Sequence, residues 1–380
     1  MKAGTAIVTG SVGRDAAMDA AMRAREALDG APVSLAVVFA SPHFFGHAQS
    51  VLDAVHEAVT PQAVLGCLAE AVLGEGREVE EEPAVSVWLA SLPSAPETFH
   101  LTFEPITGGG TFDGWPAEGA EPGAFLLLGD PFTFPADPFL RALNDRAPGT
   151  IVMGGMASGG AGPGGTVLFR DGELVSDGAV GCRLPVTMVP LVSQGCRPVG
   201  RSFTVTKAEG NVIQELAGSP AIDRVRETYA ALAPPDRELM ANGLHIGRVI
   251  DEYRTEYGQG DFLIRGVLGA DPETGAVAVG DVIEVGETVQ FHVRDAASAD
   301  EDLRAMLDRT VDGKPAGALL FTCNGRGSRL FNTPDHDAAL VAERLGVPTA
   351  GFFAAGEFGP VGGRNFLHGF TASLAVFLEP

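Results

Sequence analysis

The residues best suited to binding chemistry lie in one glycine-rich stretch near the C-terminus, Cys323-Asn324-Gly325-Arg326-Gly327-Ser328-Arg329. This stretch follows an apolar run that is typical of a buried strand. A glycine-rich turn at the carboxyl end of a strand lets backbone N–H groups approach a ligand, and two arginines could clamp a carboxylate or phosphate. The stretch is neither a dinucleotide fingerprint nor a P-loop. We therefore expect a small-ligand site; the alternative is a tight turn whose arginines pair with an acidic surface.

A second glycine-rich stretch follows and carries Gly356, Glu357, Arg364 and Asn365. Its glycines shape a loop with these polar groups at its rim. We expect the two stretches to wall a cleft between the two halves of the chain. A small anionic or zwitterionic molecule would lie there, with Arg326 and Arg364 binding its carboxylate and Glu357 its amine. The alternative is a structural ion pair between Glu357 and an arginine.

Cys323 could be a nucleophile if Arg326 and the start of the following helix favoured its thiolate, with His336 as base. No recognised catalytic motif supports this chemistry, and a cysteine at the end of a strand is more often buried and inert. We expect a protein that is not an enzyme, and a cysteine-dependent enzyme remains an alternative.

Haem binding is a further alternative, because a single histidine can ligate haem iron. Of the eight histidines, His43 and His47 flank Phe44 and Phe45, which could wall a flat cofactor. The same loop could equally pack its phenylalanines onto the core. C-x-x-C-H and H-E-x-x-H motifs are absent. We expect no cofactor and no metal.

Composition narrows the class of protein. Lys and Arg total 26 against 49 Asp and Glu, a formal charge of −23, which would repel nucleic acid and anionic membranes. The 45% of hydrophobic residues allow a large core. Four scattered cysteines, no leader pattern and no membrane-length apolar run indicate a cytoplasmic protein. The acidic run from Glu75 to Glu82 is typical of a solvated turn.

The elements that must position these residues form a unit of strand, helix, strand and strand that occurs three times. The crossover helices predict parallel first and second strands, whose carboxyl ends bind ligands in open sheets. Glu70 and Ser158 would lie at this edge in the first two copies. The second strands share a local pattern: Gly66-Cys67-Leu68-Ala69-Glu70, Gly154-Gly155-Met156-Ala157-Ser158 and Gly351-Phe352-Phe353-Ala354-Ala355.

A different segment, a hairpin and helix followed by a meander of short strands, separates the second and third copies. A proline-bearing linker at residues 187–200 precedes it, so we expect domains at 1–195 and 196–380. The predicted fold is α/β or α+β, with mixed, partly antiparallel sheets covered by outer helices. We expect two sheets packed face to face.

Several segments resemble the FIST domain family, in both its N-terminal and C-terminal parts. They are Gly66-Cys67-Leu68-Ala69-Glu70 with Gly74-Glu75-Gly76-Arg77-Glu78-Val79, Ala208-Glu209-Gly210-Asn211-Val212-Ile213-Gln214-Glu215-Leu216, Phe321-Thr322-Cys323-Asn324-Gly325-Arg326-Gly327, and Gly351-Phe352-Phe353-Ala354-Ala355-Gly356-Glu357-Phe358-Gly359-Pro360. The resemblance implies a sensory module of intracellular signal transduction that binds a small ligand such as an amino acid, with residues 1–195 and 196–380 as its two FIST parts. Some family members are reported to bind haem, so a haem-binding gas sensor is the alternative. The chain has no kinase, methyl-accepting or F-box segment, so its downstream partner is open.

Overall fold

The computed structural model describes residues 1–107, 109–116, 122–254, 256–309 and 312–379. The chain forms two compact units: unit 1 is Met1–Val192 with Arg304–Pro380, and unit 2 is Ser193–Leu303. The first boundary falls within the predicted linker, but the chain returns to unit 1 after Leu303. The units therefore differ from the expected halves at 1–195 and 196–380, because the third repeat completes unit 1.

Unit 1 contains three sheets, each with its strands in a defined spatial order. Across the first sheet the order is β12 (Glu173–Val175), β11 (Leu168–Arg170), β3 (Val64–Leu68), β2 (Leu35–Ala40), β6 (Ala84–Ser91) and β1 (Lys2–Thr9). Across the second it is β25 (Arg364–His368), β24 (Glu357–Val361), β10 (Ile151–Met156), β9 (Ala124–Gly129), β13 (Ala179–Leu184), β7 (Thr98–Ile106) and β8 (Gly109–Asp113). Across the third it is β5 (Arg77–Val79), β4 (Val72–Gly74), β23 (Thr349–Ala354), β22 (Pro315–Cys323), β26 (Thr371–Leu378) and β14 (Met188–Gln194).

The three sheets are built alike, which confirms the predicted repeat. In each, two parallel strands joined by a helix form the centre: β2 and β3 through α2 (Ala48–Val59), β9 and β10 through α3 (Ala136–Arg146), and β22 and β23 through α7 (His336–Leu345). The first strand of each pair also lies antiparallel to β6, β13 or β26. The predicted mixed α+β architecture is therefore present three times in unit 1.

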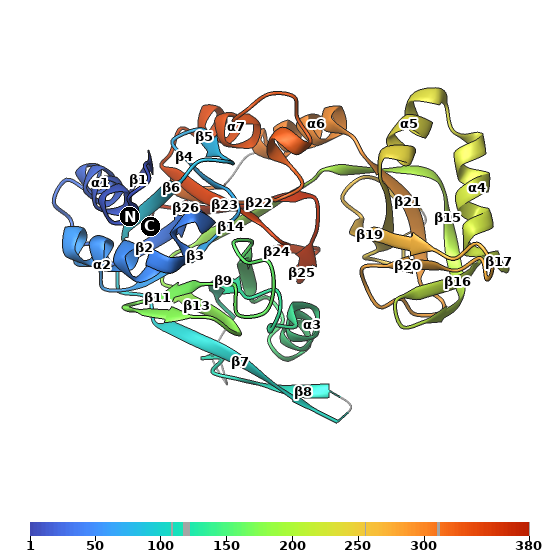
Figure 1. Cartoon of the computed structure of the whole chain (residues 1–380), viewed down its shortest axis with the longest axis horizontal. Coiled ribbons are helices and arrows are strands. Elements are labelled where there is room, and N and C mark those ends of the chain that lie inside the picture. Colours follow the sequence, from blue (N-terminus) through green and yellow to red (C-terminus); the bar gives the residue numbers. More distant parts are fainter. Residues whose placement is uncertain (108, 117–121, 255, 310–311, 380) are drawn as a thin grey trace. The chain divides into compact units, whose positions relative to one another are not determined.

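The repeats exchange their hairpins. The β4–β5 hairpin of the first repeat pairs with β23 of the third, β11–β12 of the second pairs with β3 of the first, and β24–β25 of the third pairs with β10 of the second. Figure 1 shows the blue strands β4 and β5 beside the red strand β23. Residues distant in the sequence are thereby brought to the same strand ends.

A glycine in each second strand lies against the backbone of the first strand. An added Cβ would meet a carbonyl oxygen at 1.8 to 1.9 Å. The three pairs are Gly66 with Val38, Gly154 with Leu127 and Gly351 with Leu320. This close approach is the physical reason for the glycine that the three sequence patterns share.

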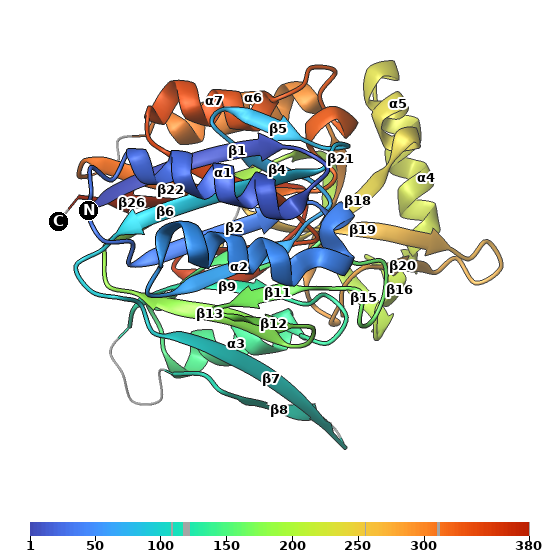
Figure 2. The same ribbon diagram turned by 60° about the vertical axis from the view of Figure 1, so that its left-hand side comes forward.

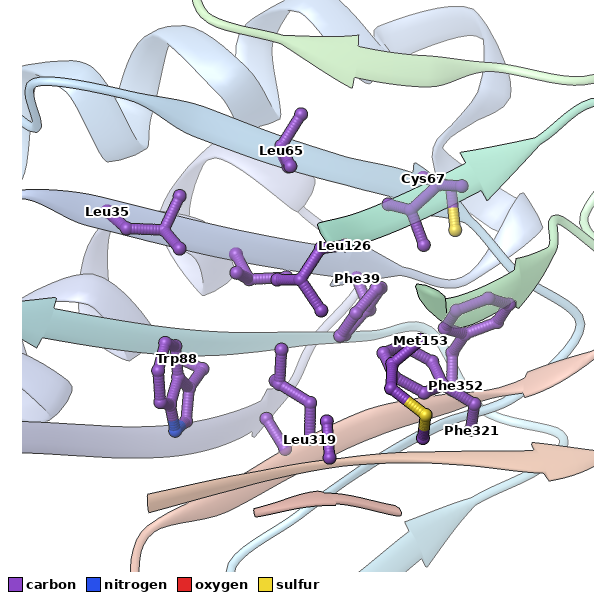
Figure 3. Packing of buried hydrophobic residues seen from close by; sticks show 14 of the residues in the cluster. Leu35, Phe39, Leu65, Cys67, Trp88, Leu126, Met153, Leu319, Phe321 and Phe352 are labelled. Carbon is purple, nitrogen blue, oxygen red and sulfur yellow. The ribbon is translucent and has the colours of Figure 1, made fainter. Parts of the chain in front are cut away.

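One hydrophobic core serves all three sheets, whereas the sequence predicts two sheets face to face. Figure 3 shows Phe39 of the first sheet, Met153 of the second and Phe321 and Phe352 of the third in the same cluster. The rings of Phe39 and Phe352 have their centroids 4.9 Å apart. Alternate side chains of each sheet point inward, so each sheet buries one face in this shared core.

Helices cover the outer faces of these sheets, as predicted. Figure 2 shows α1 (Gly13–Glu26) and α2 over β1, β6 and β2, and their small apolar residues pack against this sheet. Helix α3 packs on the second sheet, and α7 lies beside β22 and β5 of the third. Helix α6 (Ala296–Leu307) spans the second boundary between the units. Among the described residues, no helix has the length and apolar character needed to cross a membrane.

Unit 2 is an antiparallel sheet with two helices, α4 (Ala221–Ala231) and α5 (Pro234–Asn242). Its strands in spatial order are β15 (Cys196–Glu209), β21 (Thr288–Arg294), β18 (Leu244–Val249), β19 (Phe262–Ala270), β20 (Val277–Val279), β16 (Val212–Leu216) and β17 (Ser219–Pro220). It buries its own cluster, which includes Phe203, Ile246 and Phe291. The predicted helix and meander of short strands both occur in this unit.

The shared glycine yields a direct test. Changing Gly351 to Ala should lower the free energy of unfolding by about 3 kcal/mol, because the new methyl group would overlap the Leu320 carbonyl. Gly172, in the turn between β11 and β12, has open space around it, so Gly172→Ala should change stability by less than about 0.5 kcal/mol. Urea denaturation measures both, and equal effects would show that the close approach has no energetic weight.

Candidate functional site

The predicted stretch at the end of β22 turns back into the protein. After Cys323 the chain forms a loop with a short 3-10 helix, Gly327–Arg329, before α7 begins. Arg326 is 1% exposed, although its neighbour Ser328 lies at the surface. A buried guanidinium in the middle of a surface loop needs a partner, because isolated buried charge is very costly.

Asp337, in the first turn of α7, is that partner. Arg326 donates from Nε to Asp337 Oδ2 at 2.6 Å and from Nη2 to Oδ1 at 2.8 Å. Thr322 Oγ1 also donates to Oδ2 at 2.7 Å, and His336 Nδ1 lies 2.9 Å from Oδ1. Burial opposes ionisation, but the charge and hydrogen bonds of Arg326 hold the pKa of Asp337 far below its ordinary value. This ion pair is bidentate and shut off from water.

Glu357, the first residue of β24, is fully buried near this pair. Thr371 donates to Glu357 Oε2 from its N–H at 3.2 Å and from its hydroxyl at 2.7 Å. Oε1 accepts from no N–H or O–H group among the described residues, and the Cys323 thiol is a weak hydrogen-bond donor to this carboxyl. Burial raises the pKa of Glu357 to about 8, against the lowering effects of Thr371, Arg326 and the Cys323 thiol. The carboxyl is therefore mostly protonated at neutral pH.

The guanidinium of Arg326 is also incompletely used. Its Nη1 is buried and has no partner in the described part of the chain. Its charge acts on both Glu357 and Cys323. We call Cys323, Arg326, Asp337, Glu357 and Thr371 the Arg326–Glu357 cluster. It contains a fixed ion pair in which Arg326 Nη1 is unpartnered, and a carboxyl group whose Oε1 accepts from no N–H or O–H group.

The cluster does not favour cysteine chemistry. Burial and the neighbouring Glu357 raise the pKa of the Cys323 thiol, so the thiolate is disfavoured. His336 stacks on Phe331, with ring centroids 3.5 Å apart, and lies against Asp337. These groups present a buried thiol and a histidine committed to an aspartate, which is a poor arrangement for a nucleophile and its base.

Other predicted residues gather at the rim of the loop. Arg329 donates to Glu70 Oε1, and Asn324 Nδ2 donates to Glu70 Oε2 at 3.3 Å. The Glu70 N–H donates to Ser158 Oγ at 2.8 Å, and Ser158 Oγ donates to the Phe353 carbonyl. Glu70, Ser158 and Asn324 follow β3, β10 and β22, so one strand end of every repeat reaches this rim.

The glycines of the two stretches shape the backbone. Gly327 has φ of 56°, and an added Cβ would meet the Phe353 ring at 2.6 Å. Gly356 has φ of 136°, another conformation that side chains disfavour. An added Cβ at Gly325 would lie 3.2 Å from the Phe370 ring. These positions allow the loop to fold tightly over the cluster.

Arg364 and Asn365 do not join the cluster, so the expected pairing of Arg326 and Arg364 on one carboxylate is wrong. In the β24–β25 hairpin Arg364 pairs with Val361, at the end opposite Glu357. Arg364 donates to Asp145 of α3 at 3.1 Å, at the surface. Asn365 is buried and holds β25 to α3 and β10 through hydrogen bonds with Asn144, Thr150 and Val152.

The sequence analysis did not identify three carboxylates at the loop and the start of α7: Asp337, Glu78 and Glu80. Glu78 is half-buried and accepts from the Ala338 N–H at 3.0 Å, and loss of solvent around the carboxyl together with Asp337 raises its pKa to about 8. Glu80 accepts from the N–H of Ser328 at 2.9 Å and from its hydroxyl at 2.6 Å. The sequence predicts a solvated turn for this acidic run, and only the exchange of the β4–β5 hairpin into the third sheet shows otherwise.

Comparison of strand pairing among the three repeats shows that the fold does not require a glutamate at position 357. The glycines Gly154, Gly66 and Gly351 pair with Phe358, Phe169 and Leu73 of the three exchanged hairpins. The residues just before these partners are Glu357, Leu168 and Val72. Leu168 and Val72 are buried in the shared core. An apolar side chain therefore satisfies the fold at this position in the other two repeats.

The residues considered for haem do not form a slot for it. His43 and His47 are exposed in the short 3-10 helix Pro42–His47. Phe44 is buried against α2, whereas Phe45 is 49% exposed, so the two rings do not wall one cavity. In the described part of the chain, no three His, Cys, Asp or Glu side chains are placed to hold one metal ion.

A hollow of about 690 Å³ lies in unit 2 and is bordered by Lys207, Gln214 and Asp271. It contains none of the predicted site residues, and its walls are mostly exposed strand surface. None of its described lining residues has a buried polar atom without a partner. The Arg326–Glu357 cluster is smaller, but its unsatisfied polar atoms make it the stronger candidate for specific binding.

Comparison with known proteins gives a consistent assignment. The FIST N domain matches residues 34–219, and the FIST C domain matches residues 221–360. An uncharacterized protein of Mycobacterium tuberculosis strain H37Rv is 50% identical over the full length of both chains. An uncharacterized protein of Mycobacterium bovis is 49% identical over all of this chain and 99% of its own length.

The buried ion pair is tested by removing one charge. Changing Asp337 to Asn leaves Arg326 without a counter-charge in the interior, so the free energy of unfolding should fall by about 3 to 5 kcal/mol. Asp308 pairs with Arg344 at the surface, and Asp308→Asn should cost less than about 1 kcal/mol. Chemical denaturation at neutral pH compares the two, and a cost below about 1 kcal/mol for Asp337→Asn would contradict a closed pair.

The carboxyl of Glu357 is tested through the pH dependence of stability. Its pKa rises from 4.5 to about 8 on folding, so the folded state holds one more proton than the unfolded state between these values. Stability should therefore fall as pH rises from about 5 to about 8, by about 1.4 kcal/mol per pH unit from this group. Glu357→Gln should remove that contribution from the slope of urea-denaturation free energy against pH. An unchanged slope would show that folding does not raise the pKa of Glu357.

Proposed function

The chain belongs to the FIST domain family, whose domains are generally associated with sensory roles in signal transduction, and from this premise we propose that it is a small-ligand-binding sensory protein. The ligand is an amino acid or a similar small carboxylate. The Arg326–Glu357 cluster is its site. We further propose that the protein acts in the cytoplasm, in keeping with four buried free cysteines, and signals to a partner that is not nucleic acid or membrane.

The observation that carries this proposal is the presence of two unsatisfied polar atoms in the buried cluster. Glu357 Oε1 and Arg326 Nη1 have no partner in the described structure. Leaving a buried polar group unpaired costs about 1 to 3 kcal/mol, and more for a charged group. A small molecule that hydrogen-bonds to both atoms would recover this cost. Asp337 already fixes the guanidinium, so the donor is held in place before binding.

The loop over the cluster supplies a route from ligand to surface. Asn324 and Arg329 bind Glu70 of the first repeat, and Ser328 binds Glu80 of the exchanged hairpin. Arg326, in the same loop, reaches the buried cluster. A ligand bound to Arg326 Nη1 would favour the arrangement of the loop that makes these surface contacts, which is the kind of local change that a signalling partner can read.

Isothermal titration against free amino acids tests this function. At least one amino acid should bind the wild-type protein, and Glu357→Gln should weaken its affinity about tenfold or more, since a hydrogen bond to a charged group is lost. Arg364→Ala is the matched control and should leave affinity unchanged, because Arg364 lies at the far end of the hairpin. Absence of binding across the panel, or full binding by Glu357→Gln, would contradict the proposed site.

A further inference from the structure

In the absence of a ligand the cluster holds one buried cation and one ionised carboxylate. Arg326 is the cation, and Asp337 takes two of its donors and its charge. Glu357 lies beside this pair and is mostly protonated at neutral pH. Its ionised form would be a second buried negative charge, and a ligand that brings a positive charge would be its counter-ion.

A ligand carboxylate would add negative charge to the same groups. Asp337 uses the Nε–H and one Nη2–H of Arg326, which leaves two N–H groups on Nη1 and one on Nη2. These donors can bind a ligand oxygen, but Asp337 already matches the charge of the guanidinium. A ligand carboxylate would therefore bring a further negative charge beside Glu357 and Asp337.

Acceptors for an ammonium group are present on two strands. Glu357 Oε1 is free on β24. Ser373 Oγ, two residues beyond Thr371 on the same face of β26, is also buried and unpartnered in the described structure. An ammonium group has three N–H donors, so Glu357 Oε1 would satisfy one of them and leave two for other acceptors.

These polar groups occur in one repeat of the three. In each repeat the first strand (β22, β2 or β9) pairs with an antiparallel strand (β26, β6 or β13). When the three pairs are aligned by register, Ala84 and Gly178 stand at the position that Thr371 has in the third repeat. The positions that match Glu357 are the core residues Val72 and Leu168. At these two positions the first and second repeats have apolar or small residues, whereas the third has an acid and the hydroxyl that holds it.

We propose that the Arg326–Glu357 cluster recognises the ammonium group of a small primary amine, with Glu357 as its counter-ion and with little contribution from any ligand carboxylate. This inference rests on the proposed function and names the part of the ligand that the site reads. The groups that face Glu357 are Cys323 of β22, Arg326 of the loop, His368 of β25 and Thr371 of β26.

Binding should then be coupled to proton release. The raised pKa of Glu357, about 8, leaves the free carboxyl mostly protonated at neutral pH. An ammonium ligand needs the ionised form, so the proton must leave when the ligand binds. Affinity should rise about tenfold per pH unit up to about pH 8 and then level off.

The experiment compares three molecules of matched size: alanine, ethylamine, which lacks the carboxylate, and propionate, which lacks the amine. Calorimetric titration is done at about pH 6, 7 and 8 in two buffers with different ionisation enthalpies. Ethylamine should bind within about threefold of alanine and propionate at least about tenfold more weakly, with about one proton released at neutral pH. Glu357→Gln should lose about tenfold or more in affinity for ethylamine. Glu78→Gln, at a half-buried carboxyl whose pKa is also raised, should stay within about twofold.

The outcomes separate the two levels of the proposal. Binding of propionate without ethylamine would overturn the ammonium inference and leave the ligand site standing. Failure of all three molecules and of the other amino acids at millimolar concentration would overturn the site itself, and the inference with it. If Glu357→Gln does not fold, the pH dependence of ethylamine binding to the wild-type protein decides, and a flat profile between about pH 6 and 8 contradicts the inference.

Discussion

The site depends on the buried ion pair between Arg326 and Asp337. Two charged hydrogen bonds join a loop residue to the first turn of α7, and Thr322 on β22 completes the arrangement. This pair holds the loop inward and fixes the guanidinium with Nη1 unpartnered. Without Asp337, Arg326 would have no reason to leave the solvent, because burying an unpaired charge is prohibitive.

The exchange of hairpins among three repeats explains how such a site can arise. Each repeat sends a hairpin into a neighbouring sheet, so a glutamate after β3 can meet an arginine after β22. The repeats also provide an internal comparison, since Leu168 and Val72 show what the fold alone accepts where Glu357 stands. The proposed site rests on this difference: a carboxyl in a core position that is held by Thr371 through one of its two oxygens.

Short-range sequence patterns predict the parts of the structure that interactions between residues near one another in the chain determine. The three strand-helix-strand units follow from periodicity, and the shared glycine follows from a close backbone approach at Gly66, Gly154 and Gly351. The glycine-rich stretch from Cys323 to Arg329 is recognisable from its turn chemistry. Each of these features depends on residues close together in the chain.

The features that the sequence does not predict depend on distant pairing. No periodicity indicates that residues 304–380 rejoin the first unit, or that three sheets rather than two share a core. Glu78 and Asp337 look like solvated charges in the sequence, because their burial requires the exchanged hairpin and the inward loop. Arg364 looks like a ligand clamp, but the length of the β24–β25 hairpin carries it to α3.

A crystal structure of the protein grown with a bound amino acid would test the central claim most directly, because the claim concerns two specific atoms. We predict electron density for the ligand within hydrogen-bond distance, about 2.7 to 3.2 Å, of both Glu357 Oε1 and Arg326 Nη1. The claim would be contradicted by a ligand bound elsewhere, with Oε1 and Nη1 contacting each other or protein groups alone.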